Sequence, residues 1–368
     1  MKYNYKLEIL TPTHIGDGTS YSNKEYYISN AKLNKTEPVK LINKVNLTEY
    51  IKSISPAQQE DFLEKLSQNT TNNDKSNGFD FEKYVEEHPR IKNFYDYKTI
   101  EVSKKTNKDE NIKHPTRIDS TITDINNKAY IPGSSIKGAI RTAIIYEYLD
   151  RENNLKSQQD YEIIVNNNEI EKIMINMSIS DSSEYKNPIR TVQILPFTLT
   201  QENDNSKTKD ENKEDMYNAI ECICTSKLNI QIQLTEENPV NMDYIKRCLF
   251  LFNYDYIDHE LTFFKKMLKK EKDINKQKQI ERIIEFYNRL KQENTKETPL
   301  IRLGGSTGLL STCIGLHMKN NNPDLYKKTY IKDKEKINEE YPKVRQITPN
   351  NQAFGWCKLK STQTEENI

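Results

Sequence analysis

Regular alternation of hydrophobic and polar residues predicts several strands in this chain. Every second residue is hydrophobic over residues 2–9, and the same holds over residues 227–234. A period of two places one face of a strand in a core and the other face in solvent. Shorter hydrophobic stretches predict further strands. The segments predicted to be strands or strand regions are 2–9, 20–33, 173–180, 227–234, 300–303 and 353–359.

Hydrophobic residues spaced three and four apart predict helices elsewhere. Over residues 135–150 they form one stripe, as expected of a helix with a single buried face. The other predicted helices are 45–68, 241–253 and 258–294. The polar segments between predicted elements are 69–78, 103–116, 201–215 and 319–345. We interpret 69–78 and 103–116 as loops and 319–345 as a charged surface insertion.

The order of these elements predicts an α+β fold with two halves. Residues 201–215 contain no hydrophobic residue, so they are predicted to be a polar linker or insertion. Each half is expected to be an antiparallel sheet with helices on one face, for which the ferredoxin-like arrangement is economical. We therefore predict an N-terminal domain at 1–200 and a C-terminal domain with a helical insertion at 216–368.

Composition and charge narrow the classes of function. The chain has 55 Lys and Arg residues against 54 Asp and Glu residues, so nucleic-acid binding would have to come from local patches. No hydrophobic run is long enough to span a membrane, and the first residues lack a signal-peptide pattern. Five cysteines are odd in number and sparse, which indicates reduced thiols and a cytoplasmic location.

Glycine is scarce and unevenly distributed. The chain has 10 glycines, fewer than half of the number expected at an average usage of about 7%. A genome rich in A and T would explain the shortage but not the clustering. Clustered glycines mark backbone that turns tightly or approaches a ligand closely. The clusters are Gly16 with Gly18, Gly133 with Gly138, and Gly304 with Gly305, Gly308 and Gly315.

The segment IPGSSIKGAIR at residues 131–141 gives the strongest signal for a binding site. A turn leads into a helix whose first N–H groups are free and whose dipole is positive at this end. Ser134 or Ser135 can cap the helix, and Lys137 and Arg141 share one face of its first turns. These features predict a phosphate cradle, and an ordinary capped helix with two solvated cations is the alternative. A nucleotide P-loop is excluded because no Lys follows the second glycine.

Two further turns follow predicted strands. In HIGDG at residues 14–18, His14 can stack on a base, donate to a phosphate or act as a general acid or base. A packed turn residue is the alternative for His14. In RLGGSTG at residues 302–308, consecutive N–H groups are of the kind that bind anions, although a tight turn explains such a loop equally well.

No other combination of residues indicates catalysis or metal binding. Asp181 is a lone carboxylate at a turn, where such residues usually act as caps. Cys222 and Cys224 are too close in sequence for the usual zinc spacing. We find no nucleophilic triad and no carboxylate pair. The sequence therefore predicts no catalytic residue, no metal site and no cofactor.

Four motifs, in this order along the chain, resemble those of the RAMP proteins of CRISPR systems: HIGDG, YIPGSSIKGAIRTA, SISDS and RLGGSTG. Their combination is similar to the Csm-type subunit that caps the 3′ end of crRNA in type III-A effector complexes. The resemblance implies two ferredoxin-like, RNA-recognition-like domains. It also implies a non-catalytic subunit that holds the 3′ region of the guide, caps the backbone filament and supports crRNA maturation in antiviral defence.

The resemblance further implies residue roles and partners. The residues of the segment 131–141 would hold guide phosphates, and those of the turn at 14–18 would line the same groove. The three glycines at 304–308 would form a late Gly-rich loop. The residues implied to bind RNA are His14, Gly16, Gly18, Gly133, Ser134, Ser135, Lys137, Arg141, Gly304, Gly305 and Gly308. The implied partners are crRNA, the neighbouring backbone RAMP subunit, the small helical subunit, host nucleases and, indirectly, target RNA.

Two other functions stay open at the level of sequence. One is a RAMP-type endoribonuclease that processes guide precursor RNA with His14 as general acid or base. Metal-free cleavage that is abolished in His14→Ala would favour it. The other is a structural scaffold without RNA contact, which crosslinking of the guide to residues 133–141 would exclude.

Overall fold

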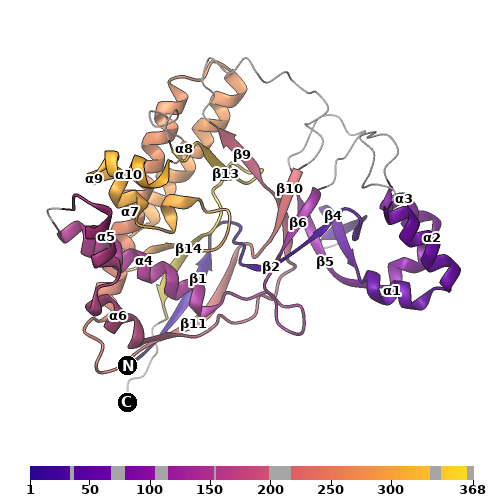
Figure 1. Ribbon diagram of the computed structural model, residues 1–368, viewed down its shortest axis with the longest axis horizontal. Coiled ribbons are helices and arrows are strands. Elements are labelled where there is room, and N and C mark those ends of the chain that lie inside the picture. The colour runs from indigo at the N-terminus through magenta and orange to yellow at the C-terminus, as the bar shows by residue number, and fades with distance from the viewer. Residues whose placement is uncertain are drawn as a thin grey trace.

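The computed structural model shows two large sheets and a small two-stranded sheet, with helices packed around them (Figure 1). The predicted polar segments 69–78 and 201–215 lie outside the described residues, as does most of 103–116. The described residues are 1–33, 37–67, 79–103, 115–152, 155–198, 217–331 and 341–362.

The five-stranded sheet is built around the N-terminal strand. Its strands are β1 (Lys2–Ile9), β7 (Met177–Ile179), β11 (Ser226–Leu234), β12 (Leu300–Arg302) and β14 (Trp356–Ser361). The order across the sheet is β12-β14-β1-β11-β7, and all neighbouring strands are antiparallel. β1 therefore lies in the middle, between two strands from later parts of the chain.

Helices cover one face of this sheet and lie on the left in Figure 1. They are α4 (Gly133–Arg151), α5 (Gln158–Val165), α6 (Asn168–Ile175), α7 (Met242–Leu268), α8 (Ile274–Glu293), α9 (Gly315–Asn321) and α10 (Pro323–Tyr330). Tyr5, Leu7 and Ile9 of β1 are buried in one core with residues of α4 and α7. Because side chains alternate along a strand, Lys6 and Glu8 lie on the opposite face.

The chain order through this part of the molecule is ferredoxin-like. β1, α4, β7, β11, α7 and β14 follow one another as β-α-β-β-α-β. The segment from β2 to β6 is inserted between β1 and α4, and β12 adds an edge strand.

The seven-stranded sheet lies to the right in Figure 1 and is mixed. Its strands are β2 (Gly16–Ser22), β3 (Tyr26–Leu33), β4 (Glu37–Val45), β5 (Tyr95–Val102), β6 (Pro115–Thr121), β8 (Arg190–Gln193) and β10 (Tyr217–Cys222). The order is β2-β6-β10-β8-β5-β4-β3, in which β6 with β10 and β5 with β8 are parallel. A separate pair joins β9 (Leu195–Thr198) to β13 (Val344–Ile347).

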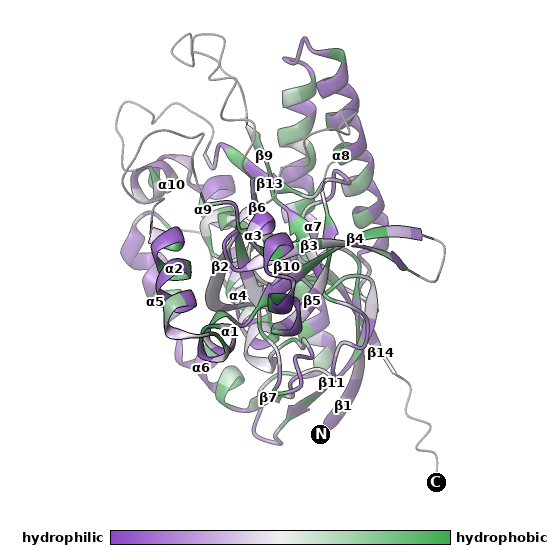
Figure 2. Cartoon of the chain, turned by 90° about the vertical axis from the view of Figure 1, so that its right-hand side faces the viewer, coloured by the Kyte–Doolittle hydropathy of each residue, from purple (hydrophilic) through white to green (hydrophobic). Residues whose placement is uncertain are grey.

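A small helical cluster packs at the far end of the seven-stranded sheet. It contains α1 (Leu47–Ser53), α2 (Pro56–Ser67), α3 (Phe81–Glu87) and the 3-10 turn Pro89–Asn93. Its core is aromatic: the rings of Tyr50 and Phe62 meet edge to face at 5.6 Å between centroids. Both hydrophilic and hydrophobic residues occur on these and the other surface helices (Figure 2). No helix in the described part of the chain is long and apolar enough to cross a membrane.

The α+β class predicted from the sequence is confirmed, and several element boundaries are corrected. The helix predicted at 45–68 is interrupted before Pro56, because Pro cannot continue a helix from the preceding turn. The break predicted between residues 253 and 258 falls instead after α7, at Leu268. The strand predicted at 173–180 is helical up to Ile175, since its hydrophobic residues continue a stripe spaced three and four apart. The charged segment 319–345 contains α10 and the first strand residues of β13.

The sheets do not divide where the sequence predicted a domain boundary. The five-stranded sheet takes β1 and β7 from one side of residues 201–215 and its other strands from the other side. β10 likewise joins a sheet whose other strands precede that segment. The second ferredoxin-like domain and the division into residues 1–200 and 216–368 stay predictions.

Candidate nucleic-acid interface

The two glycine-containing turns that follow β1 and β12 contact one another. The N–H of Gly305 donates to the carbonyl oxygen of His14 at 2.8 Å. Gly304 has a φ of +85°, and a Cβ at this position would lie 2.0 Å from the same oxygen. Glycine is therefore required at Gly304 both by conformation and by close approach. Two turns from opposite ends of the chain thus form one surface.

The His14 side chain is held by a backbone carbonyl at the junction of the two large sheets. The residue is only 7% exposed, and Nδ1 lies 2.8 Å from the carbonyl oxygen of Glu221 in β10. Burial lowers the pKa of His14, so the neutral ring is favoured. A Cβ on Gly16 would lie 3.1 Å from Nε2, which shows that this edge of the ring faces the turn.

A buried carboxylate beside this turn was not predicted from the sequence. The Glu221 side chain accepts hydrogen bonds from the hydroxyl groups of Tyr21 at 2.8 Å and Tyr97 at 2.9 Å. It also accepts one from the N–H of Thr121 at 3.0 Å. Burial raises the pKa of Glu221. The sign of this carboxylate in the sequence is a single acidic residue within the hydrophobic stretch that forms β10.

The start of α4 is capped by a residue distant in sequence. The N–H of Gly133 donates to Oδ1 of Asp181 at 2.8 Å, and the N-cap residue itself makes no side-chain bond. The prediction that Ser134 or Ser135 caps this helix is therefore wrong, whereas the prediction that Asp181 acts as a cap is confirmed. The close packing of the helix start on the end of β7 brings the aspartate to the first free N–H.

The two cations predicted at the start of α4 bind backbone carbonyls of the chain itself. Lys137 Nζ donates to the carbonyl oxygen of Met177 at 2.7 Å. Arg141 Nη2 donates to that of Val165 at 3.1 Å. Both side chains therefore brace α4 against its neighbours. Each has further N–H groups for a phosphate, because an ammonium carries three donors and a guanidinium five.

A short hairpin connects the His14 turn to the start of α4. The N–H of Ile122 donates to the carbonyl oxygen of Ile15 at 2.7 Å. Thr123 then pairs with Ala129 across the hairpin, and α4 begins shortly after Ala129. The three predicted loops are therefore linked by a few residues of paired backbone and belong to one region of the molecule.

The predicted residues differ in exposure. His14 and Gly133 are buried, whereas Gly304, Ser135 and Lys137 are half-buried. The exposed ones are Gly16, Gly18, Ser134, Arg141, Gly305 and Gly308.

A cavity of about 250 Å³ lies beside the late Gly-rich loop, and two buried arginines are among the residues that line it. Arg302 donates from Nε to the carbonyl oxygen of Phe354 at 3.0 Å and lies over the ring of Trp356. Arg345 pairs with Glu260 at 2.9 Å. These interactions anchor the segments on which the loop rests.

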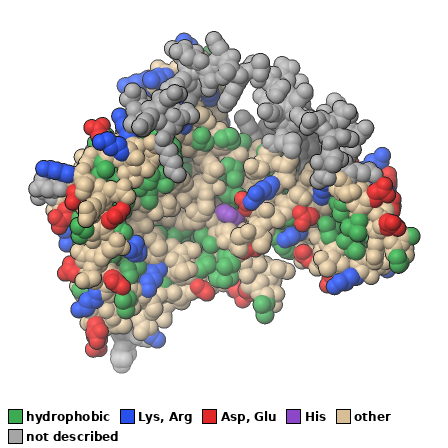
Figure 3. Space-filling view, viewed as in Figure 1, with side chains coloured by type: hydrophobic (Ala, Val, Ile, Leu, Met, Phe, Trp, Pro, Cys, Tyr) green, Lys and Arg blue, Asp and Glu red, His purple; other side chains and the backbone are tan. Residues whose placement is uncertain are grey.

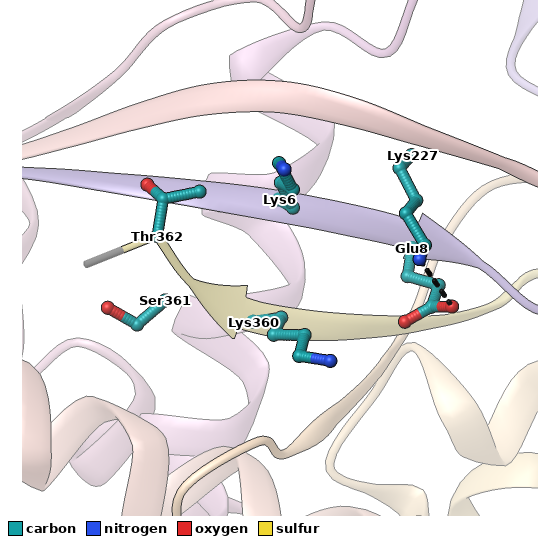
Figure 4. A pocket seen from close by; sticks show the side chains of 6 residues that line it. All are labelled: Lys6, Glu8, Lys227, Lys360, Ser361 and Thr362. Atoms are coloured by element: carbon teal, nitrogen blue, oxygen red, sulfur yellow. Dashed lines mark ion pairs between the residues drawn. The ribbon is translucent and has the colours of Figure 1, made fainter. Parts of the chain in front are cut away.

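A second hollow, of about 340 Å³, lies on the uncovered face of the five-stranded sheet (Figure 4). Lysines from three strands line it, namely Lys6, Lys227 and Lys360, together with Glu8. Glu8 and Lys227 approach to 3.8 Å. None of the predicted binding residues lies in this hollow, so it offers a separate basic surface for comparison.

Charge alone does not mark a nucleic-acid groove on the face seen in Figure 3, where Lys and Arg side chains are spread among Asp and Glu. Within the described ranges, no group of three or more His, Cys, Asp or Glu side chains is arranged to hold a metal ion.

Comparisons with known proteins agree with the motifs. The RAMP superfamily matches residues 6–354. A protein of Methanocaldococcus jannaschii described as "CRISPR system Cms protein Csm5" is 32% identical over 148 residues, which are 40% of this chain and 31% of that protein. A protein of Streptococcus thermophilus with the same description is 28% identical over 144 residues, 38% of each chain. The chain thus matches only about a third of the length of these relatives, 31% of one and 38% of the other.

Two solved structures share the fold. A chain in a cryo-EM structure of a Csm-crRNA-target RNA ternary complex of a type III-A CRISPR-Cas system has a TM-score of 0.63 and 17% identity, over 98% of this chain and all of that one. The crystal structure of T. onnurineus Csm5 has a TM-score of 0.56 and 15% identity, over 96% of this chain and 99% of that one.

Proposed function

Because this chain belongs to the RAMP superfamily, we propose that it is a non-catalytic crRNA-binding subunit of a type III-A CRISPR effector complex. In this function it holds the 3′ region of the guide, caps the filament of backbone subunits and supports crRNA maturation in antiviral defence. Its partners are the neighbouring backbone RAMP subunit, the small helical subunit, target RNA through the guide, and host nucleases. The complex works in the cytoplasm.

The names and contents of the similar proteins support this proposal. Both curated relatives are described as Csm5 proteins of CRISPR systems. One similar chain belongs to a complex that contains crRNA and target RNA.

The observation that carries the proposal is the hydrogen bond from Gly305 to His14. It joins two exposed turns, each with backbone that can approach a ligand closely, and the short hairpin leads from them to the cations of α4. A bound RNA strand needs protein backbone that it can approach closely at several successive nucleotides. It also needs positive charge nearby, because contacts with phosphates supply most of the affinity of a protein for RNA.

In the proposed interface Lys137 and Arg141 bind guide phosphates with the N–H groups that their internal bonds leave available. The exposed Ser134 and the turns containing Gly16 and Gly305 contact the sugar and phosphate backbone. The Asp181 carboxylate at the first N–H of α4 keeps phosphate away from that position, so the cations bind phosphate along the helix face rather than at its tip.

Alanine substitution of both cations tests the proposal. Lys137→Ala with Arg141→Ala should weaken binding of single-stranded RNA. It should also reduce the slope of log affinity against log salt by about 0.7 for each phosphate that is no longer bound. Fluorescence anisotropy at several salt concentrations measures both quantities. A urea unfolding curve checks that removal of the two internal hydrogen bonds has not unfolded the chain.

A matched pair on the uncovered sheet face serves as the control. Lys6→Ala with Lys360→Ala also removes two positive charges, but from the hollow in Figure 4. RNA affinity and salt slope should then stay close to those of the wild type. Equally weakened binding in both pairs, or unchanged binding in the α4 pair, would contradict the proposed interface.

A further inference from the structure

The internal hydrogen bond of His14 determines which of its ring nitrogens can contact a ligand, and in what capacity. The partner of Nδ1 is a carbonyl oxygen, at 2.8 Å. A carbonyl oxygen only accepts hydrogen bonds, so Nδ1 must carry the proton. In the neutral ring Nε2 then has a lone pair and no hydrogen, and it acts only as an acceptor.

The Nε2 edge of this ring is open because its neighbours are glycines. A Cβ on Gly16 would lie 3.1 Å from Nε2, and a Cβ on Gly305 would lie 3.0 Å from the adjacent Cδ2. Gly16 and Gly305 are both exposed. A ligand that lies against these two backbone segments therefore reaches Nε2.

The charges around His14 disfavour a phosphate at this position. Asp17 on β2 and Asp119 on β6 act electrostatically on the ring, and the backbone carbonyl of Glu221 on β10 holds it from behind. The two aspartates favour the protonated ring, but burial is the larger effect and favours the neutral one. A bare Nε2 beside carboxylates repels an anion and accepts from a neutral donor.

We propose that His14 Nε2 accepts a hydrogen bond from a ribose 2′-hydroxyl and thereby selects RNA over DNA. This inference rests on the proposed function, because it places the same RNA strand across the turns of Gly16 and Gly305. The 2′-hydroxyl is the neutral donor that the backbone of RNA presents at every nucleotide. A contact with it does not depend on the guide sequence, whereas a contact with a base N–H would.

The test compares two main probes and three variants, and RNAs with one base replaced serve as a further check. The probes are a labelled single-stranded RNA and the same strand with 2′-fluorine in place of every 2′-hydroxyl. Fluorine keeps an RNA-like sugar pucker but cannot donate. Wild-type protein should prefer the RNA. His14→Asn should reduce this preference about fivefold to tenfold, the size expected for one hydrogen bond. The Asn amide reaches the Glu221 carbonyl in place of Nδ1 but does not extend to the position of Nε2.

Gly16→Ala provides a second variant in which His14 and its internal bond are unchanged. The added methyl group would lie 3.1 Å from Nε2 and cover it, so the preference for RNA should fall as it does in His14→Asn. His88→Asn is the matched control, because His88 Nδ1 also contacts a backbone carbonyl, that of Tyr84, at 3.0 Å. It should keep the full preference.

Each contrary outcome has a distinct meaning. Equal binding of both probes by wild-type protein overturns the role of the 2′-hydroxyl, as does a preference that both His14→Asn and Gly16→Ala retain. If binding weakens when one base is replaced but is unchanged by 2′-fluorination, the donor belongs to a base. This result also overturns the role of the 2′-hydroxyl. A chain that binds neither probe contradicts the proposed function itself.

Discussion

At the scale of the residue, the behaviour of His14 follows from one contact that the sequence does not show. A histidine after a strand and before two glycines is compatible with stacking, phosphate binding or proton transfer. The carbonyl of Glu221, which is far away in sequence, fixes the protonated nitrogen at Nδ1. The motif therefore marked His14 as a candidate, but what its ring can do chemically depends on tertiary structure.

The lowered pKa of His14 predicts a pH-dependent stability. Its folded pKa lies below that of the unfolded chain, so on acidification the unfolded state takes up this proton first. The free energy of unfolding should therefore fall as pH decreases through the ordinary range of histidine, by up to about 1.4 kcal/mol per pH unit for this group. Urea unfolding at a series of pH values gives the free energy of unfolding as a function of pH. The slope of this free energy against pH should be smaller in His14→Asn than in the wild type.

A part of the slope should remain in that variant. The pKa of His317 is also lowered by burial, and its protonation acts in the same direction. An unchanged slope in His14→Asn would show that His14 is not held neutral by the fold.

At the scale of the element, hydrophobic periodicity predicted the position of the central helix well. It did not predict which residues this helix contacts. The stripe over residues 135–150 anticipated α4, and the alternation over residues 2–9 anticipated β1, because each pattern reflects one buried face. The cap of α4 comes from Asp181 across a tertiary contact, and a local capping rule cannot include such a residue. The carbonyl partners of Lys137 and Arg141 were missed for the same reason.

Two glycines of α4 should respond in opposite ways to alanine. A Cβ at Gly133 would lie 2.1 Å from the carbonyl oxygen of Ile179, so Gly133→Ala should force α4 away from β7 and cost about 1 to 3 kcal/mol. A Cβ at Gly138 would meet open space. Gly138→Ala should stabilise the exposed helix by about 0.5 to 1 kcal/mol. Urea unfolding measures both changes, and a similar cost at the two positions would contradict the close packing at Gly133.

At the scale of the whole molecule, strands that are neighbours in the sheets are often far apart in the sequence. β1 pairs with β11 and β14, and β10 completes a sheet formed by earlier strands. Strand pairing over such separations depends on which hydrophobic faces fit together, and alternation within one segment contains no such information. The sequence therefore indicated the α+β class and three of the loops, but not that the turns after β1 and β12 meet.

If the proposed function is correct, these turns and the start of α4 together hold the 3′ region of a guide RNA. Photocrosslinking in the assembled complex examines this arrangement without any substitution in the protein, with 4-thiouridine placed at successive positions of the guide's 3′ region and adducts mapped by mass spectrometry. We expect adducts in residues 14–18, 133–141 and 304–308. Adducts confined to the lysine hollow around Lys6 and Lys360, or none on this subunit, would contradict the proposed binding surface.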